Sequence, residues 1–319
     1  MLRLGILGCG VIAAKVAESL RDNKKVVIAG VASRERNKAK KFAQEHCPDA
    51  KIFGGYEKLA SSDEIDLIYI ATPNTYHYEH AIMCIKEYKS ILIEKPFAMS
   101  KAEADSIFFE AKNRGVFVAE AMWTSYLPLH KKVLEWISAG KIGGVRYVTA
   151  NLGYDIENVP RLGSLALGGG SYLDLGVYTT NLALSFMGND IKVSKVYGRM
   201  TSAGIDRDTT YIMETDDGNI LGNFYVTMCA NTDRDGMIIG EKGNIKLIDI
   251  NNYRKVILCA QDGSVLEEAE AEGDYLHGYA YEFEACADAI KKGLIQVPDM
   301  PWSRTVRIAQ ISDTIRSMM

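Results

Sequence analysis

The sequence predicts an α/β protein of two domains, in which a parallel sheet is followed by a larger, mainly antiparallel open sheet. Two patterns carry this prediction. In the first third of the chain, short apolar runs alternate with stretches of helical periodicity, whereas from residue 193 onward short β-rich runs follow one another. The early apolar runs are continuous rather than alternating, which is typical of parallel strands buried on both faces.

The first domain is expected to span residues 1–122. Its expected strands are 2–7, 26–32, 65–71, 90–93 and 116–118. The helices expected between them are 11–20, 38–45, 77–86 and 101–113. Strands that alternate with helices form βαβ units, so this part of the chain predicts a parallel sheet covered by helices on both faces.

The second domain, an α+β domain, is expected to span residues 123–319. Its expected helices are 129–139, 173–187, 279–292 and 303–317. Its expected strands, joined by Gly- and Asp-rich turns, are 193–200, 209–214, 220–227, 236–239, 244–248 and 255–259. The last helix, 303–317, is a candidate to pack back on the first domain. The charges on helix 279–292, among them Glu282, Glu284 and Asp288, predict a solvated face.

Composition excludes several classes of protein. The 319 residues carry 37 Lys and Arg against 41 Asp and Glu, a net charge of −4, whereas nucleic-acid and anionic-membrane binders need clustered positive charge. No apolar run approaches the ~20 residues that span a bilayer, and the N-terminus lacks a signal-peptide pattern. The six cysteines form no close pairs, so we expect reduced thiols, no metal site and a cytoplasmic location.

A glycine-rich turn directly follows the first expected strand. Residues 8–13 read G-x-G-x-x-A and open an amphipathic helix. Gly8 permits the tight turn, and Gly10 lets the backbone approach a pyrophosphate. The first helical residues, Val11 and Ile12, present free N–H groups and a partial positive charge to phosphates. A simple βα turn is the alternative, but this context predicts a dinucleotide-binding Rossmann domain.

The end of the second strand bears on the choice between NADP(H) and NAD(H). An NAD site usually holds an Asp or Glu there, against the ribose 2′-hydroxyl. Here the strand 26–32 is followed by Ser33, Arg34 and Glu35. A hydroxyl and a guanidinium suit a 2′-phosphate, so we favour NADP(H). Glu35 leaves NAD(H) as the alternative.

Two further motifs stand at the carboxyl ends of expected parallel strands, the edge at which open α/β sheets bind ligands. The first contributes the candidate cofactor-binding residues Thr72, Pro73, Asn74 and His77. The second contributes Glu94 and Lys95, which precede Pro96. Lys95 is also a candidate catalytic residue, for which an ordinary surface lysine is the alternative.

With these motifs and a later stretch, G-G-G-S-Y-L-D-L-G-V-Y at 168–178, the chain resembles the glucose–fructose oxidoreductase/inositol dehydrogenase/MocA family. The likeness rests on G-x-G-x-x-A, A-T-P-N-x-x-H at 71–77, E-K-P at 94–96 and that stretch, and it spans essentially the whole chain. Within the family, segments 120–123 and 159–162 resemble the dimeric dihydrodiol dehydrogenase branch.

The resemblance implies a Rossmann domain followed by a domain whose open sheet is the usual oligomer interface, hence a homodimer or homotetramer. It implies that Lys95 lies beside the nicotinamide and the reacting oxygen, and that the peptide before Pro96 is often cis. It also implies that Asp174 contacts the substrate. Trp123 and Arg161 are candidates to line the substrate pocket, and a loop ion pair is the alternative for Arg161.

Four residues after Asp174, where many family members carry a histidine acid/base, this chain has Tyr178, as the dihydrodiol branch does. Residues four apart share one face of an α-helix. Tyrosine has a pKa of ~10, but a neighbouring ammonium lowers it, so Lys95 and Tyr178 together would form a proton relay. A core aromatic is the alternative for Tyr178, and a cap or ion pair for Asp174.

These residues lead to one principal hypothesis and two alternatives. The principal hypothesis is an NADP-dependent oxidoreductase that transfers a hydride between nicotinamide and the CH–OH or C=O group of a vicinal diol, aldose or related polyol. One alternative is an NAD-dependent sugar or inositol dehydrogenase of the same fold. The other is a sensor that binds NADP without turnover, because fold alone does not determine function.

Overall fold

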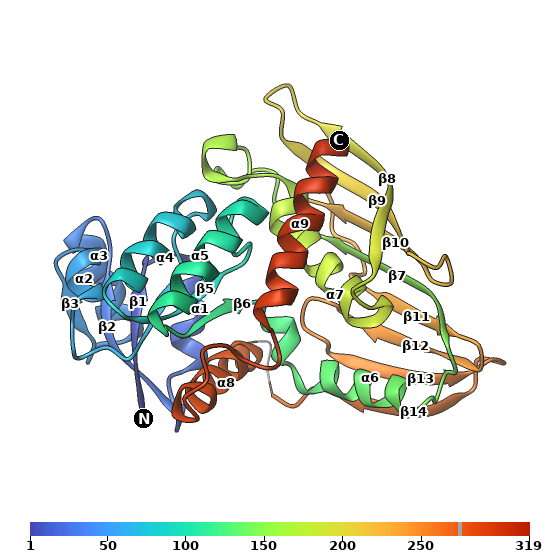
Figure 1. Ribbon diagram of the computed structural model, residues 1–319, viewed down its shortest axis with the longest axis horizontal. Coiled ribbons are helices and arrows are strands. Elements are labelled where there is room, and N and C mark those ends of the chain that lie inside the picture. The colour runs from blue at the N-terminus through green and yellow to red at the C-terminus, as the bar shows by residue number, and fades with distance from the viewer. Residues whose placement is uncertain (274–275) are drawn as a thin grey trace. The chain divides into compact units, whose positions relative to one another are not determined.

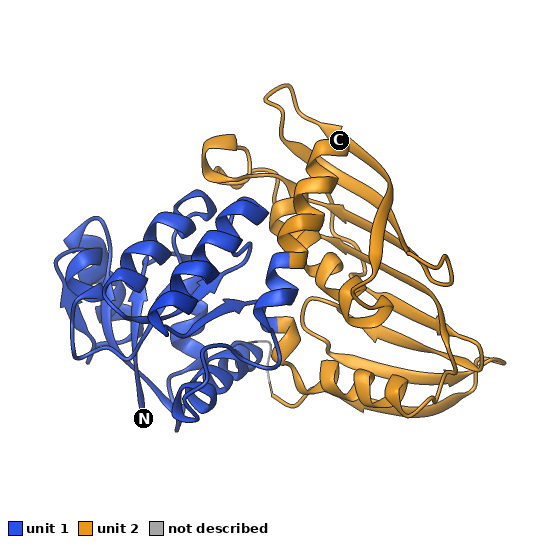
Figure 2. Ribbon diagram, viewed as in Figure 1, with its two compact units in different colours: residues 1–123, 274–306 blue, residues 124–273, 307–319 orange. Residues whose placement is uncertain are grey.

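The computed structural model describes residues 1–273 and 276–319. The chain forms two compact units, which Figure 2 distinguishes by colour. Unit 1 comprises residues 1–123 and 274–306, and unit 2 comprises residues 124–273 and 307–319. The first stretch of unit 1 ends one residue after the expected boundary at 122, and a C-terminal segment returns to unit 1 before the chain ends in unit 2.

Unit 1 is built on a six-stranded parallel sheet in the order β3-β2-β1-β4-β5-β6. Its strands are β1 (Leu2–Leu7), β2 (Val26–Ala32), β3 (Lys51–Phe53), β4 (Leu67–Ile70), β5 (Ser90–Glu94) and β6 (Val118–Ala121). This is the strand order of the Rossmann fold, and it confirms the predicted parallel sheet. The short edge strand β3 was not expected.

Helices flank this sheet (Figure 1). They are α1 (Val11–Ser19), α2 (Arg36–His46), α3 (Tyr56–Ala60), α4 (His77–Lys86), α5 (Lys101–Arg114) and α8 (Ala280–Lys291), with the 3-10 turns η1 (Asn74–Tyr76) and η5 (Leu276–Tyr279). Their ends follow local chemistry. At the start of α5, the Ser100 hydroxyl accepts the Glu103 N–H at 3.2 Å, and Gly115 ends that helix at a left-handed φ of 66°.

Unit 2 is built on an eight-stranded sheet in the order β14-β13-β12-β11-β7-β10-β9-β8. Its strands are β7 (Val145–Gly153), β8 (Ile191–Met200), β9 (Asp206–Thr215), β10 (Leu221–Thr227), β11 (Gly236–Gly240), β12 (Gly243–Ile248), β13 (Lys255–Ala260) and β14 (Val265–Glu270). Strands β7 and β10 pair in parallel and the other pairs are antiparallel, which confirms the mainly antiparallel sheet.

Helices α6 (Pro128–Ser138) and α7 (Val177–Met187) pack against this sheet (Figure 1). The buried residues Val148, Ala150 and Leu152 alternate along β7 with less buried ones, so one face of the sheet is the core of unit 2. The 3-10 turns η2 (Trp123–Tyr126) and η3 (Leu165–Leu167) and the π-helix η4 (Tyr172–Gly176) complete the helical elements up to α7.

The last helix, α9 (Trp302–Met318), begins in unit 1 and ends in unit 2. Trp302 stacks on Phe108 with ring centroids 4.9 Å apart, and its indole N–H donates to the Val118 carbonyl at 2.8 Å. The first turn of the helix therefore belongs with the Rossmann unit. From residue 307 onward the helix belongs to unit 2, and its apolar residues Ile311 and Ile315 are buried.

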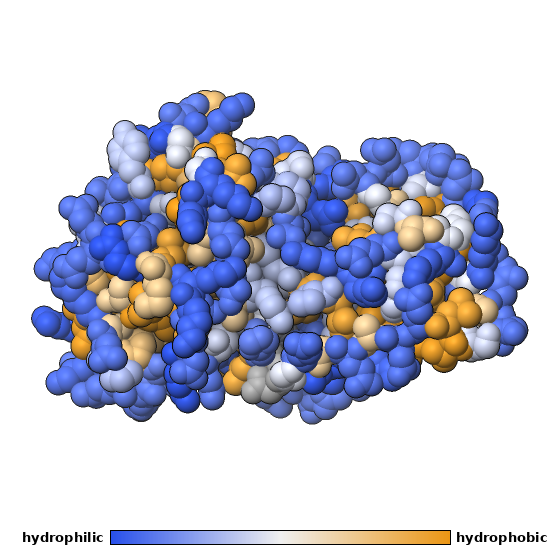
Figure 3. Space-filling model, turned by 90° about the horizontal axis from the view of Figure 1, so that it is seen from below, coloured by the Kyte–Doolittle hydropathy of each residue, from blue (hydrophilic) through white to orange (hydrophobic). Residues whose placement is uncertain are grey.

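The face of the molecule shown in Figure 3 is mostly hydrophilic, with smaller hydrophobic patches. Among the described residues, no helix has both the length and the apolar character needed to cross a membrane. All six cysteines are free thiols, and five of them are buried.

Candidate active site

The glycine-rich turn after β1 has the geometry that a pyrophosphate site requires. Gly8 has a φ of +108°, and a Cβ there would lie 2.7 Å from the Ala71 carbonyl oxygen, so a side chain is excluded. A Cβ at Gly10 would meet nothing within 4 Å, and no side chain caps the N-terminus of α1. Val11, the first residue of that helix, is 80% exposed. The free N–H groups of this turn are thus open to an anion.

Arg34, directly after β2, lies against a wall of aromatic rings. Its guanidinium carbon is 6.0 Å from the centroid of the Tyr76 ring. The Tyr56 hydroxyl accepts the backbone N–H of Arg34. Arg34 is exposed, whereas the neighbouring Ser33 is buried. Arg34 therefore packs against aromatic side chains, while its guanidinium is exposed to solvent.

His80 connects the members of this aromatic wall. Its ring stacks on Tyr76 with centroids 5.9 Å apart and meets the edge of Tyr56 at 4.9 Å. Its Nδ1 lies 3.0 Å from the Thr72 hydroxyl. Burial lowers the pKa of His80, and the positive charge of Arg34 acts in the same direction, so the ring is neutral at neutral pH. A neutral ring can lie beside Arg34 without charge repulsion.

His77 joins the two candidate loops that follow β4 and β5. It is fully buried, with Nε2 2.9 Å from the Thr72 carbonyl oxygen and Nδ1 2.9 Å from the Pro96 carbonyl oxygen. Burial lowers its pKa to about 4, against the carbonyl contacts, which favour the charged ring. Asn74 in the same loop is also buried, and Pro73 is half-buried. The buried His77 ring therefore links the loop after β4 to the loop after β5.

The E-K-P turn leaves β5 with its glutamate pointing into the unit. The Tyr69 hydroxyl donates to one oxygen of Glu94, and the Lys95 backbone N–H donates to the other at 3.1 Å. Glu94 is buried and Lys95 is half-buried. The Lys95–Pro96 peptide is cis.

Two more glutamates lie buried beside this turn, and neither was expected there. Glu120 on β6 and Glu282 on α8 are 1% and 0% exposed. Burial, with a smaller contribution from the charge of Glu94, raises the pKa of Glu120 to about 7. The expectation that Glu282 lies on a solvated face is therefore wrong. Charge alternation along α8 indicated exposure, but the residue turns inward, toward Glu94 and Glu120.

Trp123, a candidate pocket residue, ends the first stretch of unit 1. It is buried, and its indole stacks on the Tyr279 ring with centroids 4.2 Å apart and an interplanar angle of 12°. Tyr279 belongs to the C-terminal segment that returns to unit 1.

In unit 2, Asp174 and Arg161 form an ion pair. The Arg161 guanidinium donates to the Asp174 carboxylate at 3.0 Å, and the two side chains are 37% and 12% exposed. This is the ion pair that the sequence left open as the alternative for Arg161. Tyr178, at the start of α7, is 8% exposed.

The segment that carries Asp174 differs from the expected α-helix 173–187. Residues Tyr172–Gly176 form a π-helix, and the α-helix begins only at Val177. The carbonyl oxygen of Gly176, the last residue of the π-helix, accepts the Thr179 hydroxyl at 3.0 Å and the Tyr211 hydroxyl at 3.3 Å. The i, i+4 argument for Asp174 and Tyr178 assumed a regular helix, which this segment is not. Single π-turns of this kind are frequent at functional sites.

Asp206, at the start of β9, anchors the π-helix. Its Oδ2 accepts the Ser171 hydroxyl and the Tyr172 backbone N–H, both at 2.7 Å, and the Thr209 hydroxyl at 3.1 Å. Gly170 has a φ of +119°, and a Cβ there would lie 2.2 Å from Asp206 Oδ1. The glycine run before Ser171 is therefore what lets the carboxylate reach this turn.

The structure gathers the sequence-derived candidates into two groups. The cofactor candidates of unit 1 lie at the carboxyl ends of its parallel strands, which meet at one edge of the sheet. Arg161, Asp174 and Tyr178 belong to unit 2. Sequence reasoning missed Tyr56, Tyr76 and His80 around Arg34, and Asp206 behind the π-helix, because nothing local marks these long-range contacts. Among the described residues, no group of His, Cys, Asp and Glu is arranged to hold a metal ion.

Comparison with known proteins identifies the family. The profile described as "Oxidoreductase family, NAD-binding Rossmann fold" matches residues 2–122, and "GFO/IDH/MocA C-terminal domain" matches residues 130–246. The trans-1,2-dihydrobenzene-1,2-diol dehydrogenase of Homo sapiens is 28% identical over 329 residues, covering 99% of this chain and 96% of the relative. The enzyme of that name from Xenopus laevis is 30% identical over 298 residues, covering 90% and 88%.

Solved structures show the same fold. KijD10, a 3-ketoreductase from Actinomadura kijaniata in complex with NADP, superposes with a TM-score of 0.84 at 22% identity, over 99% of this chain and 97% of that one. An aldose-aldose oxidoreductase from Caulobacter crescentus complexed with glycerol gives a TM-score of 0.86 at 18% identity, with the same coverage. With both family profiles matched along its length, the chain is an oxidoreductase that belongs to the GFO/IDH/MocA family and carries its NAD(P)-binding Rossmann fold.

Proposed function

We propose that this protein uses NADP(H) to transfer a hydride to or from the CH–OH or C=O group of a vicinal diol, aldose or related polyol. The observation that carries the cofactor assignment is Arg34, which is exposed at the end of β2 and supported by Tyr76 and Tyr56. A guanidinium at this position favours a 2′-phosphate, where an NAD site holds a carboxylate. The names of the dihydrodiol dehydrogenase and aldose oxidoreductase relatives support the substrate class.

In this proposal some residues bind the cofactor and the substrate, and others transfer the proton. When bound, NADP(H) supplies hydride chemistry at its nicotinamide. The Gly8–Gly10 turn and the N-terminus of α1 bind the pyrophosphate. The Lys95 ammonium polarises the substrate oxygen, and Asp174 orients the substrate hydroxyl. In alcohol oxidation, Tyr178 in its phenolate form would take the hydroxyl proton, with bound NADP⁺ as the hydride acceptor; in reduction, the Tyr178 hydroxyl would return the proton, with NADPH as the hydride donor.

The cofactor assignment is tested by replacing Arg34. For Arg34→Asp we expect the KM for NADPH to rise at least about tenfold while the KM for NADH stays within a few-fold, because the carboxylate repels a phosphate but not a hydroxyl. Lys40→Asp is the matched control, since Lys40 is an exposed cation on the neighbouring α2. An unchanged NADPH/NADH ratio would reject NADP preference in favour of the NAD-dependent alternative.

The catalytic assignment is tested with Tyr178→Phe and Lys95→Met. Each is expected to lower kcat by about 10²–10⁴-fold, the usual contribution of acid–base groups, with NADPH affinity by fluorescence titration within a few-fold of wild type. Tyr88→Phe, at an exposed tyrosine, is the control. The substrate panel comprises diols, aldoses and dicarbonyls. Near-native turnover in both variants would reject these roles, and intact NADPH binding without turnover of any compound would favour the sensor.

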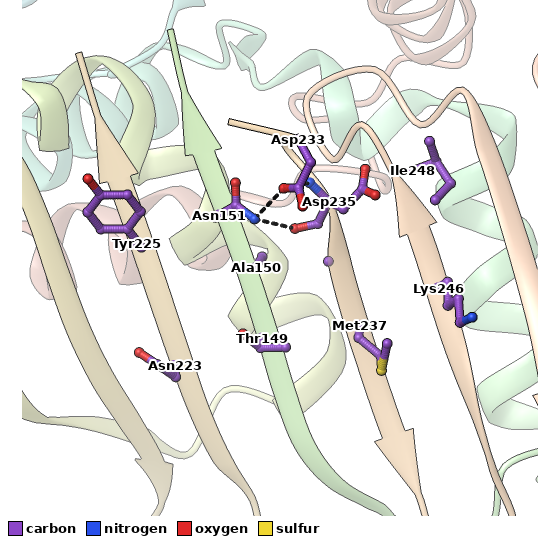
Figure 4. Close-up of a pocket in the computed structure, with 11 residues that line it drawn as sticks. Thr149, Ala150, Asn151, Asn223, Tyr225, Asp233, Asp235, Met237, Lys246 and Ile248 are labelled. Atoms are coloured by element: carbon purple, nitrogen blue, oxygen red, sulfur yellow. Dashed lines mark hydrogen bonds between the residues drawn. The ribbon is translucent and has the colours of Figure 1, made fainter. Parts of the chain in front are cut away.

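We also propose that the protein forms a homodimer or homotetramer through the face of the unit 2 sheet that its core does not use. Figure 4 shows a pocket on this sheet, lined by residues of β7, β10, β11 and β12 and by Asp233 and Asp235 of the loop before β11. Asn151 donates to Asp233 at 2.6 Å in this pocket, and Lys246 also lines it. Exposed Leu221 and Ile239 extend the face. A face with both charges and apolar side chains can pair with its own copy about a two-fold axis.

Light scattering after size exclusion tests this assembly. We expect a dimer or tetramer for the wild type and a smaller species for Ile239→Lys combined with Leu221→Lys. Leu294→Lys, at an exposed leucine of unit 1, is the control and should leave the mass unchanged. A monomeric wild type would reject the proposal.

A further inference from the structure

The three glutamates Glu94, Glu120 and Glu282 form a buried cluster in unit 1 that the proposed chemistry does not use. They are 7%, 1% and 0% exposed and come from β5, β6 and α8. The charges of Glu94 and Glu120 both act on Glu282. Buried carboxyl groups are rare unless they are paired or bind a metal. Within the described residues, this cluster is not arranged as a metal site.

Two members of the cluster hold the backbone of the E-K-P turn. Glu94 accepts the Lys95 N–H at 3.1 Å, and the Glu120 carboxyl accepts the Phe97 N–H. Between them, the Pro96 carbonyl oxygen lies 2.9 Å from His77 Nδ1. Each of the three consecutive residues that begin with Lys95 therefore has a backbone group held by a buried titratable side chain. This arrangement determines where the Lys95 backbone sits.

The hydrogen bonds indicate where the cluster keeps its charge. Glu94 receives two donors, the Tyr69 hydroxyl and the Lys95 N–H, which favour an ionised carboxylate. Glu282 is at the opposite extreme, because both of its oxygens are buried without a hydrogen-bond partner among the described residues. An ionised carboxylate without donors is the costliest state in such a site, so Glu282 is most stable as the neutral acid.

The other titratable groups near the cluster leave this charge pattern in place. Tyr69 on β4 and Cys286 on α8 have pKa values raised well above their usual range, chiefly by burial, and stay neutral. Tyr279 of η5 further raises the pKa of Tyr69, and the charge of Asp299 further raises that of Cys286. Burial raises the pKa of Glu120 to about 7, and burial together with Glu94 and Glu120 raises that of Glu282 well above the usual range.

We propose that Glu120 and Glu282 are positioning residues for Lys95. While both keep their protons, the single charge on Glu94 holds the turn in place. When a second carboxyl ionises, repulsion within the cluster displaces the turn and moves Lys95. This inference rests on the proposed role of Lys95, but the cluster acts on the turn whether or not a substrate is known.

The first test replaces Glu282 by glutamine, which has the same shape and cannot ionise. At pH values above the ordinary Glu pKa of 4.5, Glu120 and Glu282 hold more protons in the folded protein than in the unfolded chain, so the stability that these two groups contribute falls as pH rises through 7. We expect the Tm of Glu282→Gln to exceed that of wild type by an amount that grows from pH 5 to pH 9. Glu284→Gln, two residues along α8 and bonded to Asn23, is the control and should follow the wild type.

A second measurement, on the reactivity of the Lys95 amine, distinguishes an effect on the position of Lys95 from an effect on stability alone. The rate of acylation of the Lys95 amine, normalised to that of exposed Lys40 and measured by mass spectrometry, needs no substrate. We expect this ratio to change above pH 7 in wild type and to stay level in Glu282→Gln. If ionisation of a second carboxyl moves Lys95, kcat of the wild type should fall at alkaline pH. In Glu282→Gln the midpoint of this fall should lie about one pH unit higher, as expected for coupled groups. Parallel Tm curves, or an unchanged Lys95 profile, would overturn the inference.

Glu120 supplies an independent variant. Glu120→Gln keeps an acceptor for the Phe97 N–H, whereas Glu120→Leu removes it. We expect the leucine variant, checked for folding by circular dichroism, to lose at least about tenfold in kcat with NADPH affinity little changed, and the glutamine variant to keep most of its activity. Equal activity in both would overturn the role of Glu120. If the wild type turns over no compound, the proposed function fails, but the Tm and acylation measurements still decide on the cluster.

Discussion

Asp206 accepts the backbone N–H of Tyr172 at 2.7 Å and thereby holds the first turn of the segment that carries Asp174 and Tyr178. The same oxygen accepts two hydroxyl groups, so one buried carboxylate organises the start of the π-helix. Four predictions follow from this segment and from the loops of the Rossmann unit.

Asp206→Ala is expected to destabilise unit 2 and to lower activity. It leaves the Tyr172 N–H and two hydroxyls without their acceptor, which costs about 1–3 kcal/mol for a buried group and several degrees in Tm. The kcat should fall more than the KM for NADPH rises, because unit 2 carries Asp174 and Tyr178. Asp206→Asn keeps one acceptor oxygen, so its Tm and kcat should lie between those of the wild type and of Asp206→Ala. Wild-type Tm and kcat in the alanine variant would contradict this role.

Gly170→Ala is expected to destabilise the protein by more than backbone strain alone. The residue has a φ of +119°, and the new Cβ would lie 2.2 Å from Asp206 Oδ1. Gly204→Ala isolates the strain, since Gly204 has a φ of +74° and a Cβ there would meet only Leu165 at 3.8 Å. We expect about 1 kcal/mol for Gly204→Ala and clearly more for Gly170→Ala in urea denaturation. Equal losses would show that the contact with Asp206 is unimportant.

Arg161→Leu is expected to change substrate binding more than stability. The ion pair with Asp174 is more than one-third exposed on the arginine side, so it contributes less than about 1 kcal/mol to folding. Removing the guanidinium takes away one partner that orients the Asp174 carboxylate, and we expect the KM for the polyol to rise several-fold with little change in Tm. Arg161→Lys keeps the charge without the planar fork and should be intermediate. An unchanged KM would remove Arg161 from the pocket.

His77 is expected to make the protein sensitive to acid. Its pKa falls from 6.5 to about 4 on folding because of burial, so between these pH values the His77 ring holds fewer protons in the folded protein than in the unfolded chain. The stability it contributes is complete above pH 6.5 and is lost as pH falls through 4, about 3 kcal/mol in all.

The measurement is Tm from pH 7 to pH 4 for wild type and His77→Asn. The variant should be less stable at pH 7, and its deficit should shrink toward pH 4. His46→Asn, at a partly exposed histidine of α2, is the control and should keep a constant offset. A deficit for His77→Asn that does not change with pH would show that the buried ring does not titrate.

Local sequence patterns predicted most elements of the fold and the outline of the candidate site. Strand β1 and helix α4 have the predicted bounds, since their apolar periodicity and boundary residues lie within the element itself. The central strand β7 was missed because its half-buried alternation includes Thr149 and Asn151, which resemble loop residues. The π-helix was expected as regular α-helix, because the extra residue is stabilised by Asp206 and Tyr211 from β9 rather than by its own neighbours.

The glycine-rich turn, the arginine after β2 and the E-K-P turn were predictable from the sequence, because each depends on residue types next to one another at the end of a strand. Their surroundings depend on the folded chain. Glu282 became a buried acid and not a surface charge because β5 and β6 bring two more carboxyl groups against α8. Arg34 likewise gained its aromatic contacts from Tyr56 of α3 and Tyr76 of η1. Burial and pairing are properties of contacts between distant segments, and a one-dimensional pattern does not contain them.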